Sequence, residues 1–253
     1  MRKSILSAAA AALLACACQS ENSAQTSTSA ALYEEQRLPG DSALYGLACE
    51  GYNDTILVFL PYTGGDPDTI NILNASIKRR VYGRPVIGDE LAVILTPDSV
   101  PTASMVINLD RLKGQWCYQV MPRLRQVAGG PTGKEKTIIA SLPDSLRQQW
   151  FQPREYGIDL QRDHIVRPIG LRYGSAASAP TPVEYPTMKR YRQWHLLNGH
   201  IILSETRRDS LGNQQVVASD TADIIMLRRD SLRLRFGDAE QGYYRKKADE
   251  GKD

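Results

Sequence analysis

The sequence is poor in the residues that build enzyme active sites and metal centres. Its 253 residues include only 3 His and 4 Cys. No Gly-x-Ser-x-Gly motif occurs, and no CxxC pair stands near a histidine pair. We therefore predict no catalytic residue, no metal site and no cofactor, and we expect the protein not to be an enzyme.

An excess of charge of one sign is also missing. Lys and Arg number 31, Asp and Glu number 28, and the formal net charge is +3. A nucleic-acid-binding protein needs surplus cations to displace counterions from phosphates, so we exclude nucleic acid as a partner. Hydrophobic residues make up 42% and charged residues 23%, a balance typical of a globular chain.

No apolar run reaches the roughly eighteen residues that a transmembrane helix needs, but a shorter one opens the chain. Arg2 and Lys3 precede an apolar run that ends at Leu14, and small residues follow. This order is typical of a secretory signal peptide, which we predict over residues 1–15. The alternative is an ordinary secretory signal in which the nearby cysteines are incidental.

The segment Leu13-Leu14-Ala15-Cys16 resembles the lipobox of bacterial lipoproteins. The resemblance implies that Cys16 carries the lipid and becomes the new N-terminus, with Cys18 as the alternative. Residues 16–40 are largely polar and are predicted to form a tether, because such a run buries little apolar surface. No Asp follows either cysteine, so the family's sorting rule favours the outer membrane, with the body facing the periplasm or the surface.

Residues 41–127 alternate short apolar runs with turn signals such as Gly64-Gly65 and Pro97-Asp98. Without an amphipathic helix of useful length, this pattern predicts a small β domain. It favours a closed or nearly closed antiparallel barrel, with OB-like and SH3-like folds as candidates. The expected strands are residues 44–49, 55–60, 69–73, 76–82, 90–95, 105–109 and 115–120.

A glycine-rich segment, residues 128–136, is the predicted linker to a second domain over residues 137–247, and residues 248–253 form a charged tail. A short helix is expected over residues 142–151. Asn198-Gly199 is the strongest hairpin signal in the chain. Eight strands in a meander predict an up-and-down β-barrel: residues 156–160, 164–169, 190–197, 200–206, 214–218, 223–227, 231–236 and 242–245.

The second half combines a strand-borne Trp194, a Gly-apolar strand after Gly199, an Asp-Thr turn at Asp220 and a closing Tyr244-Arg245. Over about residues 136–247 this pattern resembles the lipocalin-like outer-membrane lipoproteins of the Bacteroides group. The resemblance implies a barrel that can hold an apolar ligand. The early Gly-x-Trp of lipocalins is absent, and residues 174–186 insert a loop rich in Ala, Pro and Ser.

Aromatic and arginine side chains on the predicted strands are the candidates for a ligand site. Tyr156, Tyr191, Trp194 and Tyr243 can line a cavity mouth, and Arg233 can present charge there. Such a stripe is also typical of ordinary core and surface positions. A barrel of eight strands leaves either a packed interior or room for one small ligand.

The sequence leaves two interpretations open for each of two residue pairs, one of cysteines and one of histidines. Cys49 and Cys117 either form a disulfide after export or remain two buried thiols. His195 and His200 flank the Asn198-Gly199 hairpin and can approach across it; they are read as ordinary strand residues, with a metal or acid-base role as the alternative.

We expect a membrane-anchored lipoprotein that binds a small apolar ligand or an envelope partner without catalysis. The alternatives are a structural subunit of an envelope complex and an envelope hydrolase. An interior emptied by small inward residues favours the ligand, whereas a filled interior with an exposed apolar patch favours the complex.

Overall fold

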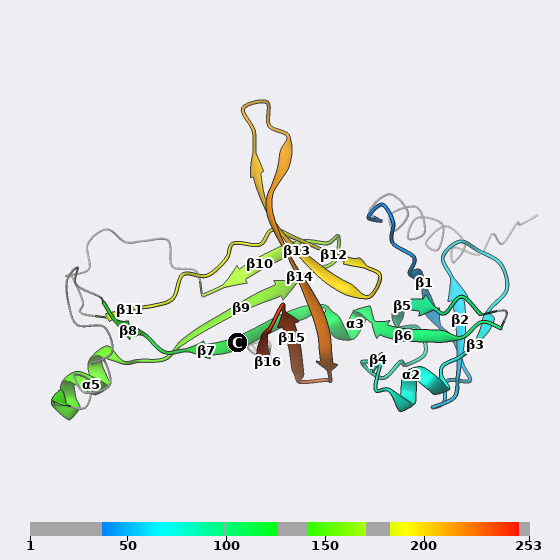
Figure 1. Ribbon diagram of the computed structural model, residues 1–253, viewed down its shortest axis with the longest axis horizontal. Coiled ribbons are helices and arrows are strands. Elements are labelled where there is room, and N and C mark those ends of the chain that lie inside the picture. Colours follow the sequence, from blue (N-terminus) through cyan, green and yellow to red (C-terminus); the bar gives the residue numbers. More distant parts are fainter. Residues whose placement is uncertain (1–36, 99, 126–140, 171–182, 248–253) are drawn as a thin grey trace, which may run out of the picture.

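The computed structural model of the chain describes residues 37–98, 100–125, 141–170 and 183–247 (Figure 1). The predicted signal peptide, both candidate anchor cysteines, most of the tether, the linker at residues 128–136 and the charged tail lie outside these ranges.

The first half forms a sheet of its own, as predicted. Its six strands follow the order β3-β2-β1-β5-β6-β4, and only β4 pairs in parallel. A bridge between Asn71 and Thr102 joins the end of β3 to the start of β6, which bends the sheet toward closure. The strands are β1 (Leu44–Ala48), β2 (Ile56–Pro61), β3 (Asp68–Asn71), β4 (Val81–Tyr82), β5 (Glu90–Leu95) and β6 (Ala103–Asn108).

This sheet has a small hydrophobic core because apolar residues recur at every second position of its strands. Leu57 and Phe59 of β2, and Leu91 and Val93 of β5, have no exposed surface. They pack together with Ile70, Ile72 and Val106. The alternation of apolar and polar residues in the sequence therefore identifies the buried face of these strands.

The expected strand at residues 76–82 is wrong over its first part. A short helix, α2 (Leu73–Ile77), occupies that region, and only Val81–Tyr82 is a strand. The Asn71 side chain accepts a hydrogen bond from the Leu73 N–H, which favours a turn at this point. Arg79 then adopts φ 55°, which ends the helical path.

The second sheet is an antiparallel barrel of eight strands in the order β10-β9-β7-β16-β15-β14-β13-β12. Its two edges meet through a bridge between Ile165 and Gln193. Hydrogen bonds of 2.8 Å from Val166 N to Arg192 O and from Trp194 N to His164 O reinforce this seam. The strands are β7 (Gly114–Val120), β9 (Arg154–Leu160), β10 (Val166–Ile169), β12 (Gln193–Leu197), β13 (His200–Arg208), β14 (Gln214–Leu227), β15 (Ser231–Phe236) and β16 (Ala239–Arg245).

The predicted barrel is confirmed, but its strands were assigned incorrectly in two places. β7 was expected in the first domain, yet it lies between β9 and β16. The short helix α3 (Leu109–Leu112) turns the chain from the first sheet into the barrel before the expected linker is reached. Residues 214–218 and 223–227 form the single strand β14, because Asp220 and Thr221 stay extended and pair with Leu203 and Ile202.

The first sheet covers one end of the barrel. Residues of the first sheet, among them Ala43, Tyr82 and Ile107, share a hydrophobic cluster with Leu112 of α3 and with barrel residues. The Asn198-Gly199 turn forms as predicted, with φ 51° and 86°. Its backbone N–H at Asn198 donates to the Asp41 carboxylate at 2.8 Å. The two sheets are therefore joined by packing as well as by the chain.

The opposite end carries smaller elements, which Figure 1 shows away from the first sheet. The expected helix is α5 (Asp144–Trp150), and β8 (Arg123–Leu124) pairs with β11 (Val183–Glu184). A ribbon formed by β13 and β14 projects from the side of the barrel (Figure 1). Among the described residues, no helix is long and apolar enough to cross a bilayer.

Candidate functional site at the open end of the barrel

The end of the barrel beside the first sheet is filled by large side chains; we call it the closed end. Trp116, Trp194, Leu112 and Leu160 are at most 2% exposed. The indole N–H of Trp116 donates to Leu112 O at 2.7 Å, and that of Trp194 donates to Gln161 O at 2.9 Å. Both indole N–H groups are thus satisfied, and the large buried side chains fill this end.

A Gly-x-Trp sequence begins the first barrel strand, so our statement that it is absent was wrong. The residues are Gly114, Gln115 and Trp116 of β7. The guanidinium of Arg245 lies 4.1 Å from the centre of the Trp116 ring and donates to Lys113 O at 2.9 Å. A Cβ on Gly114, which has φ +124°, would lie 2.4 Å from Arg245 Nη1. The glycine therefore makes room for the arginine that covers the tryptophan.

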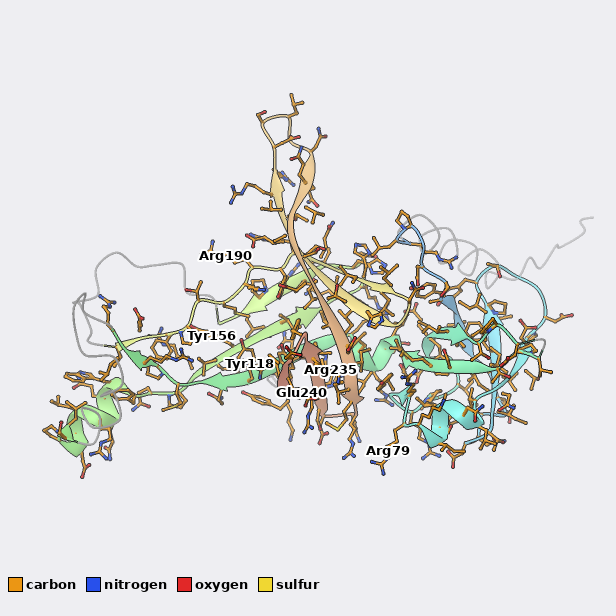
Figure 2. All side chains as sticks on the ribbon, viewed as in Figure 1. Arg79, Tyr118, Tyr156, Arg190, Arg235 and Glu240 are labelled. Carbon is orange, nitrogen blue, oxygen red and sulfur yellow. The ribbon has the colours of Figure 1, made fainter. Side chains whose placement is uncertain are left out.

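The other end of the barrel, the open end, is lined by tyrosines. Tyr118 of β7 is two residues beyond Trp116 and points to the same interior face. Its ring meets that of Tyr243 at 5.3 Å and that of Tyr156 at 6.3 Å, both edge-on at 88°. Figure 2 shows Tyr118 and Tyr156 next to each other along β7 and β9. The three rings together form an aromatic floor.

An acid and a lysine stand at the side of this floor. The Tyr191 hydroxyl donates to Asp220, and Lys189 Nζ donates to the same carboxylate at 2.7 and 2.8 Å. Partial burial opposes ionisation of Asp220, but the hydrogen bonds from Lys189 and Tyr191 hold its pKa below the ordinary value. Asp220 is therefore an anion near neutral pH, and Lys189 balances its charge.

The tyrosine hydroxyls remain neutral donors. Burial raises the pKa of Tyr243 and of Tyr191, and burial followed by the neighbouring Tyr156 raises the pKa of Tyr118. Within the described part of the chain, the hydroxyls of Tyr118, Tyr156 and Tyr243 make no hydrogen bond to protein. They are free to donate to a ligand in the mouth.

A cavity of about 440 Å³ lies at this end. Small-molecule sites commonly range from about 300 to 1,000 Å³, so the cavity has the size for one compact ligand. Its lining combines aromatic, apolar and polar groups with one cation, Arg123; among the other lining residues are Tyr118, Tyr156, Met121, Thr187 and Gln241. We call this space the tyrosine mouth.

The five predicted ligand candidates separate into two groups. Tyr156, Tyr191 and Tyr243 lie at the open end, and of the three only Tyr156 lines the cavity, whereas Tyr191 and Tyr243 pack against the core. Trp194 is buried in the packed closed end. Arg233 faces outward and approaches Glu240 at 3.9 Å. Neither reaches the tyrosine mouth: Trp194 faces inward at the other end of the barrel, and Arg233 is on the outer face because a strand turns alternate side chains to opposite faces.

The sequence interpretation missed two residues that line the mouth, Tyr118 and Gln241, and also missed Asp220, which bonds to Tyr191. Tyr118 was missed because β7 was assigned to the first domain. The alternation Gly114-x-Trp116-x-Tyr118 was the available signal. Asp220 lies in a predicted turn, and Gln241 precedes the last predicted strand by one residue.

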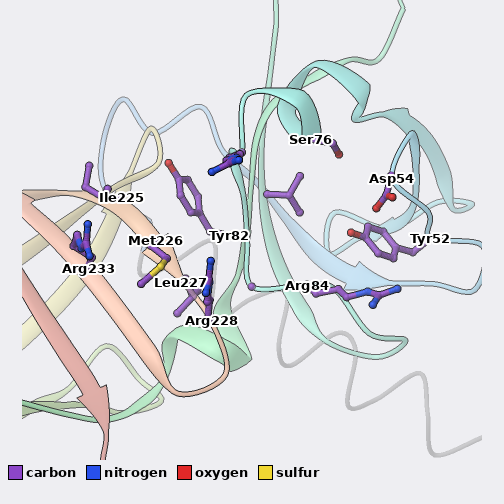
Figure 3. Close-up of a pocket in the computed structure, with 13 residues that line it drawn as sticks. Tyr52, Asp54, Ser76, Tyr82, Arg84, Ile225, Met226, Leu227, Arg228 and Arg233 are labelled. Carbon is purple, nitrogen blue, oxygen red and sulfur yellow. The ribbon is translucent and has the colours of Figure 1, made fainter.

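A second hollow of about 640 Å³ lies between the barrel and the first sheet (Figure 3). Tyr52 and Arg84 line it from the first sheet, and Arg228 and Arg233 line it from the barrel. Figure 3 shows Arg84 directed toward Tyr52 and away from Arg228. Its charged groups do not converge on one point, so it is the weaker candidate.

The cysteine and histidine pairs do not form sites. Cys49, which follows β1, and Cys117 of β7 are free thiols, and burial raises the pKa of Cys117 to about 11, which keeps it unreactive. His195 stacks on His164 at 4.7 Å, whereas His200 bonds to Asp223, so the two predicted histidines do not meet. Among the described residues, no group of three or more His, Cys, Asp or Glu is placed to hold a metal ion.

Comparison with known proteins gives one match. The model of a lipocalin-like family matches residues 143–247, whereas no curated protein and no solved structure matches the chain. The matched range holds the barrel strands from β9 to β16 and leaves out β7. The barrel of the structure thus begins at Gly114, before the matched range.

Proposed function

We propose that this protein is a non-enzymatic binding protein whose barrel takes a small, largely apolar ligand in the tyrosine mouth. The observation that carries the proposal is the cavity of about 440 Å³ floored by tyrosines whose hydroxyls have no protein partner within the described residues. The match of a lipocalin-like family to residues 143–247 supports it.

The filled closed end limits the shape of the ligand. Trp116 and Leu232 have at most 1% of their surface exposed and close the interior below the tyrosine floor. A long acyl chain needs a deep interior, so it does not fit there. A compact ring compound fits better, because the rings of Tyr118 and Tyr156 offer apolar faces and their hydroxyls donate hydrogen bonds.

A second candidate function is docking to an envelope partner. The ribbon of β13 and β14 exposes Leu211, Val216 and Val217, with Leu211 84% exposed. Apolar side chains on a projecting ribbon favour contact with another molecule. This supports the alternative of a subunit in an envelope complex, in which the ribbon rather than the mouth makes the contact.

The cellular setting of the proposal rests on the sequence of the leader. Acylation of Cys16, or of Cys18, would tether the body to the outer membrane by the polar residues that follow. Replacing each cysteine singly with Ser and following radiolabelled palmitate tests this. Loss of label with Cys16→Ser supports the proposal, and label that survives both substitutions contradicts it.

The mouth is tested with a neutral fluorescent probe, N-phenyl-1-naphthylamine, titrated into the full chain. Gln241 lines the mouth, and the adjacent Glu240 pairs with Arg233 outside. Gln241→Trp should fill the cavity and abolish the saturable fluorescence increase, because it occupies the space the probe needs. Glu240→Trp adds the same indole on the outer face and serves as the matched control.

The proposal requires saturable binding by the unmodified chain and by Glu240→Trp only. Equal binding by both variants would place the probe elsewhere and contradict the mouth as the site. Near-ultraviolet circular dichroism checks that both variants keep the fold.

A further inference from the structure

Five arginines gather on the outer surface of the barrel, at the seam where β10 meets β12. They line a groove of about 680 Å³ together with Glu205 and Gln214. We call it the seam groove. Its arginines are Arg167 of β10, Arg190 and Arg192 before β12, and Arg207 and Arg208 at the end of β13.

The backbone holds these arginines close together. Arg192 O accepts from Val166 N, and Arg192 N donates to Ser204 O, both at 2.8 Å. The segments before β12, at β10 and at the end of β13 therefore run side by side. Figure 2 shows Arg190 at the base of the projecting ribbon. The clustering follows from the closure of the barrel and does not depend on the side-chain rotamers.

Four of the five arginines of the groove are not balanced by acids of the described residues. Within the described residues, the side chains of Arg167, Arg192, Arg207 and Arg208 make no ion pair and no hydrogen bond. Arg235 on the other side of the barrel, in contrast, bonds to Asp223 at 2.8 Å. Glu205 is the only acid in the groove lining, so the groove carries a clear excess of positive charge.

Clustered guanidinium groups recognise a particular chemistry. Each guanidinium presents a planar fork of donors that matches two oxygens of a phosphate group. Several such forks around one groove fit several phosphates held close together. We propose that the seam groove binds a polyanion with clustered phosphate groups, either a soluble polyphosphate or the phosphorylated headgroup of a lipid.

This site is separate from the tyrosine mouth. Tyr191, between Arg190 and Arg192, reaches Asp220 at the open end, whereas both arginines are exposed. The ribbon beside the groove exposes Leu211 and Val216, which would contact the apolar part of a lipid. Binding of a phosphorylated lipid would therefore involve the ribbon as well as the groove, whereas binding of a soluble polyphosphate would involve the groove alone.

The test measures binding of tripolyphosphate to the full chain by isothermal titration calorimetry. The groove variant combines Arg167→Gln, Arg192→Gln and Arg207→Gln. The control variant combines Arg80→Gln, Arg84→Gln and Arg229→Gln, which removes the same charge from exposed arginines outside the groove. We expect the groove variant to lose affinity by about tenfold or more and the control variant by about twofold or less. Only the groove variant removes guanidinium groups that would bind the phosphates.

Equal losses in the two variants would show that only net charge matters and would overturn the proposal, as would failure of the unmodified chain to bind tripolyphosphate. Arg207→Lys keeps the charge and loses the fork, so it should fall between the unmodified chain and the groove variant. Unfolding curves for all variants separate loss of binding from loss of fold.

A second arm distinguishes the two sources of phosphate. The full chain with Cys16→Ser and Cys18→Ser is floated with phosphatidylcholine vesicles, with and without phosphatidylinositol bisphosphate. Binding that needs the phosphorylated lipid, and that falls with Val216→Ser as well as with the groove variant, identifies a headgroup. Tripolyphosphate binding without vesicle binding identifies a soluble polyphosphate.

Discussion

The two ends of the barrel are built from the same strands and differ in the side chains that face the interior. On β7, Trp116 faces the closed end and Tyr118 faces the open end, two residues apart on one face. Trp116 is fully buried and its indole N–H is satisfied by Leu112 O. Tyr118 keeps a hydroxyl that no described residue engages. The comparison indicates that one end stabilises the fold, and the other is the end that we propose to bind a ligand.

The first sheet adds to the difference between the two ends because it covers only the closed end. The Asn198-Gly199 turn contacts Asp41, and a Cβ on Gly199 would lie 2.5 Å from Met105 Sδ. The first sheet therefore seals the filled end and leaves the tyrosine mouth accessible. Substitutions at the two ends should differ accordingly in their effect on stability.

The largest effect is expected from Trp116→Ala. Truncating a fully buried tryptophan removes its packing and leaves a cavity, and it also removes the ring beneath Arg245. We expect the free energy of unfolding to fall by about 3–5 kcal/mol, measured by urea denaturation. A loss below about 1 kcal/mol would mean that the closed end is not the stabilising one.

Gly114→Ala should have the next largest effect. The residue has φ +124°, and the new Cβ would collide with Arg245 Nη1. We expect a loss of about 1–3 kcal/mol from backbone strain together with displacement of the arginine. Gly242→Ala is the matched control, since no atom lies within 4 Å of its Cβ position and its φ is not positive. Equal losses for the two substitutions would refute the role of the Arg245 contact.

Acid should weaken the closed end through His164. Burial, then His195 and Lys113, lower the pKa of His164 to about 4 from the ordinary 6.5. Between about pH 4 and pH 6.5, His164 is therefore protonated in the unfolded chain and neutral in the folded chain. Its contribution to stability is complete above about pH 6.5 and is lost as the pH falls toward 4.

The expected loss is about 1–3 kcal/mol between pH 7 and pH 4, measured by urea denaturation at each pH. His164→Gln should flatten this dependence. His200→Gln, at an exposed histidine bonded to Asp223, should leave the His164 contribution in place. A pH dependence that survives His164→Gln unchanged would contradict the assignment.

The smallest effect on stability is expected from Tyr118→Phe, because its hydroxyl has no partner among the described residues. We expect a change of no more than about 0.5 kcal/mol in unfolding free energy. Affinity for a hydrogen-bonding ligand should fall several-fold, measured by titration. A large loss of stability would show that the hydroxyl has a structural role.

Much of the architecture follows from local patterns. The alternation Leu232-x-Leu234 and the Asn198-Gly199 turn predict β15 and the β12–β13 hairpin, and both are present. Each of these patterns lies within one strand or turn, so it can be recognised without knowing which other strands pair with it. The barrel could therefore be predicted from the second half of the chain.

Assignments that depend on distant partners were the ones that failed. β7 reads as one more short strand after β6, and only its pairing with β9 and β16 places it in the barrel. Asp220-Thr221 reads as a turn, and only the pairing with β13 keeps it extended. Tertiary context decides these cases, because local strand propensity carries no information about the partner.

The candidate site shows the same division. Tyr156, Tyr191 and Tyr243 were predicted because they lie on strands of the second half. Trp194 was also predicted, but its position along β12 puts it at the closed end. Which end of a barrel an inward residue faces depends on the register of all eight strands, and the sequence of one strand does not give it.

Native mass spectrometry of the full chain, purified from the cells that produce it, tests most directly whether the tyrosine-lined end holds a ligand. We predict a mass excess from one bound small molecule on the unmodified chain and on Glu240→Trp, and no such excess on Gln241→Trp. An unmodified chain that carries no molecule under conditions that preserve its fold, or a Gln241→Trp chain that retains one, would contradict the account.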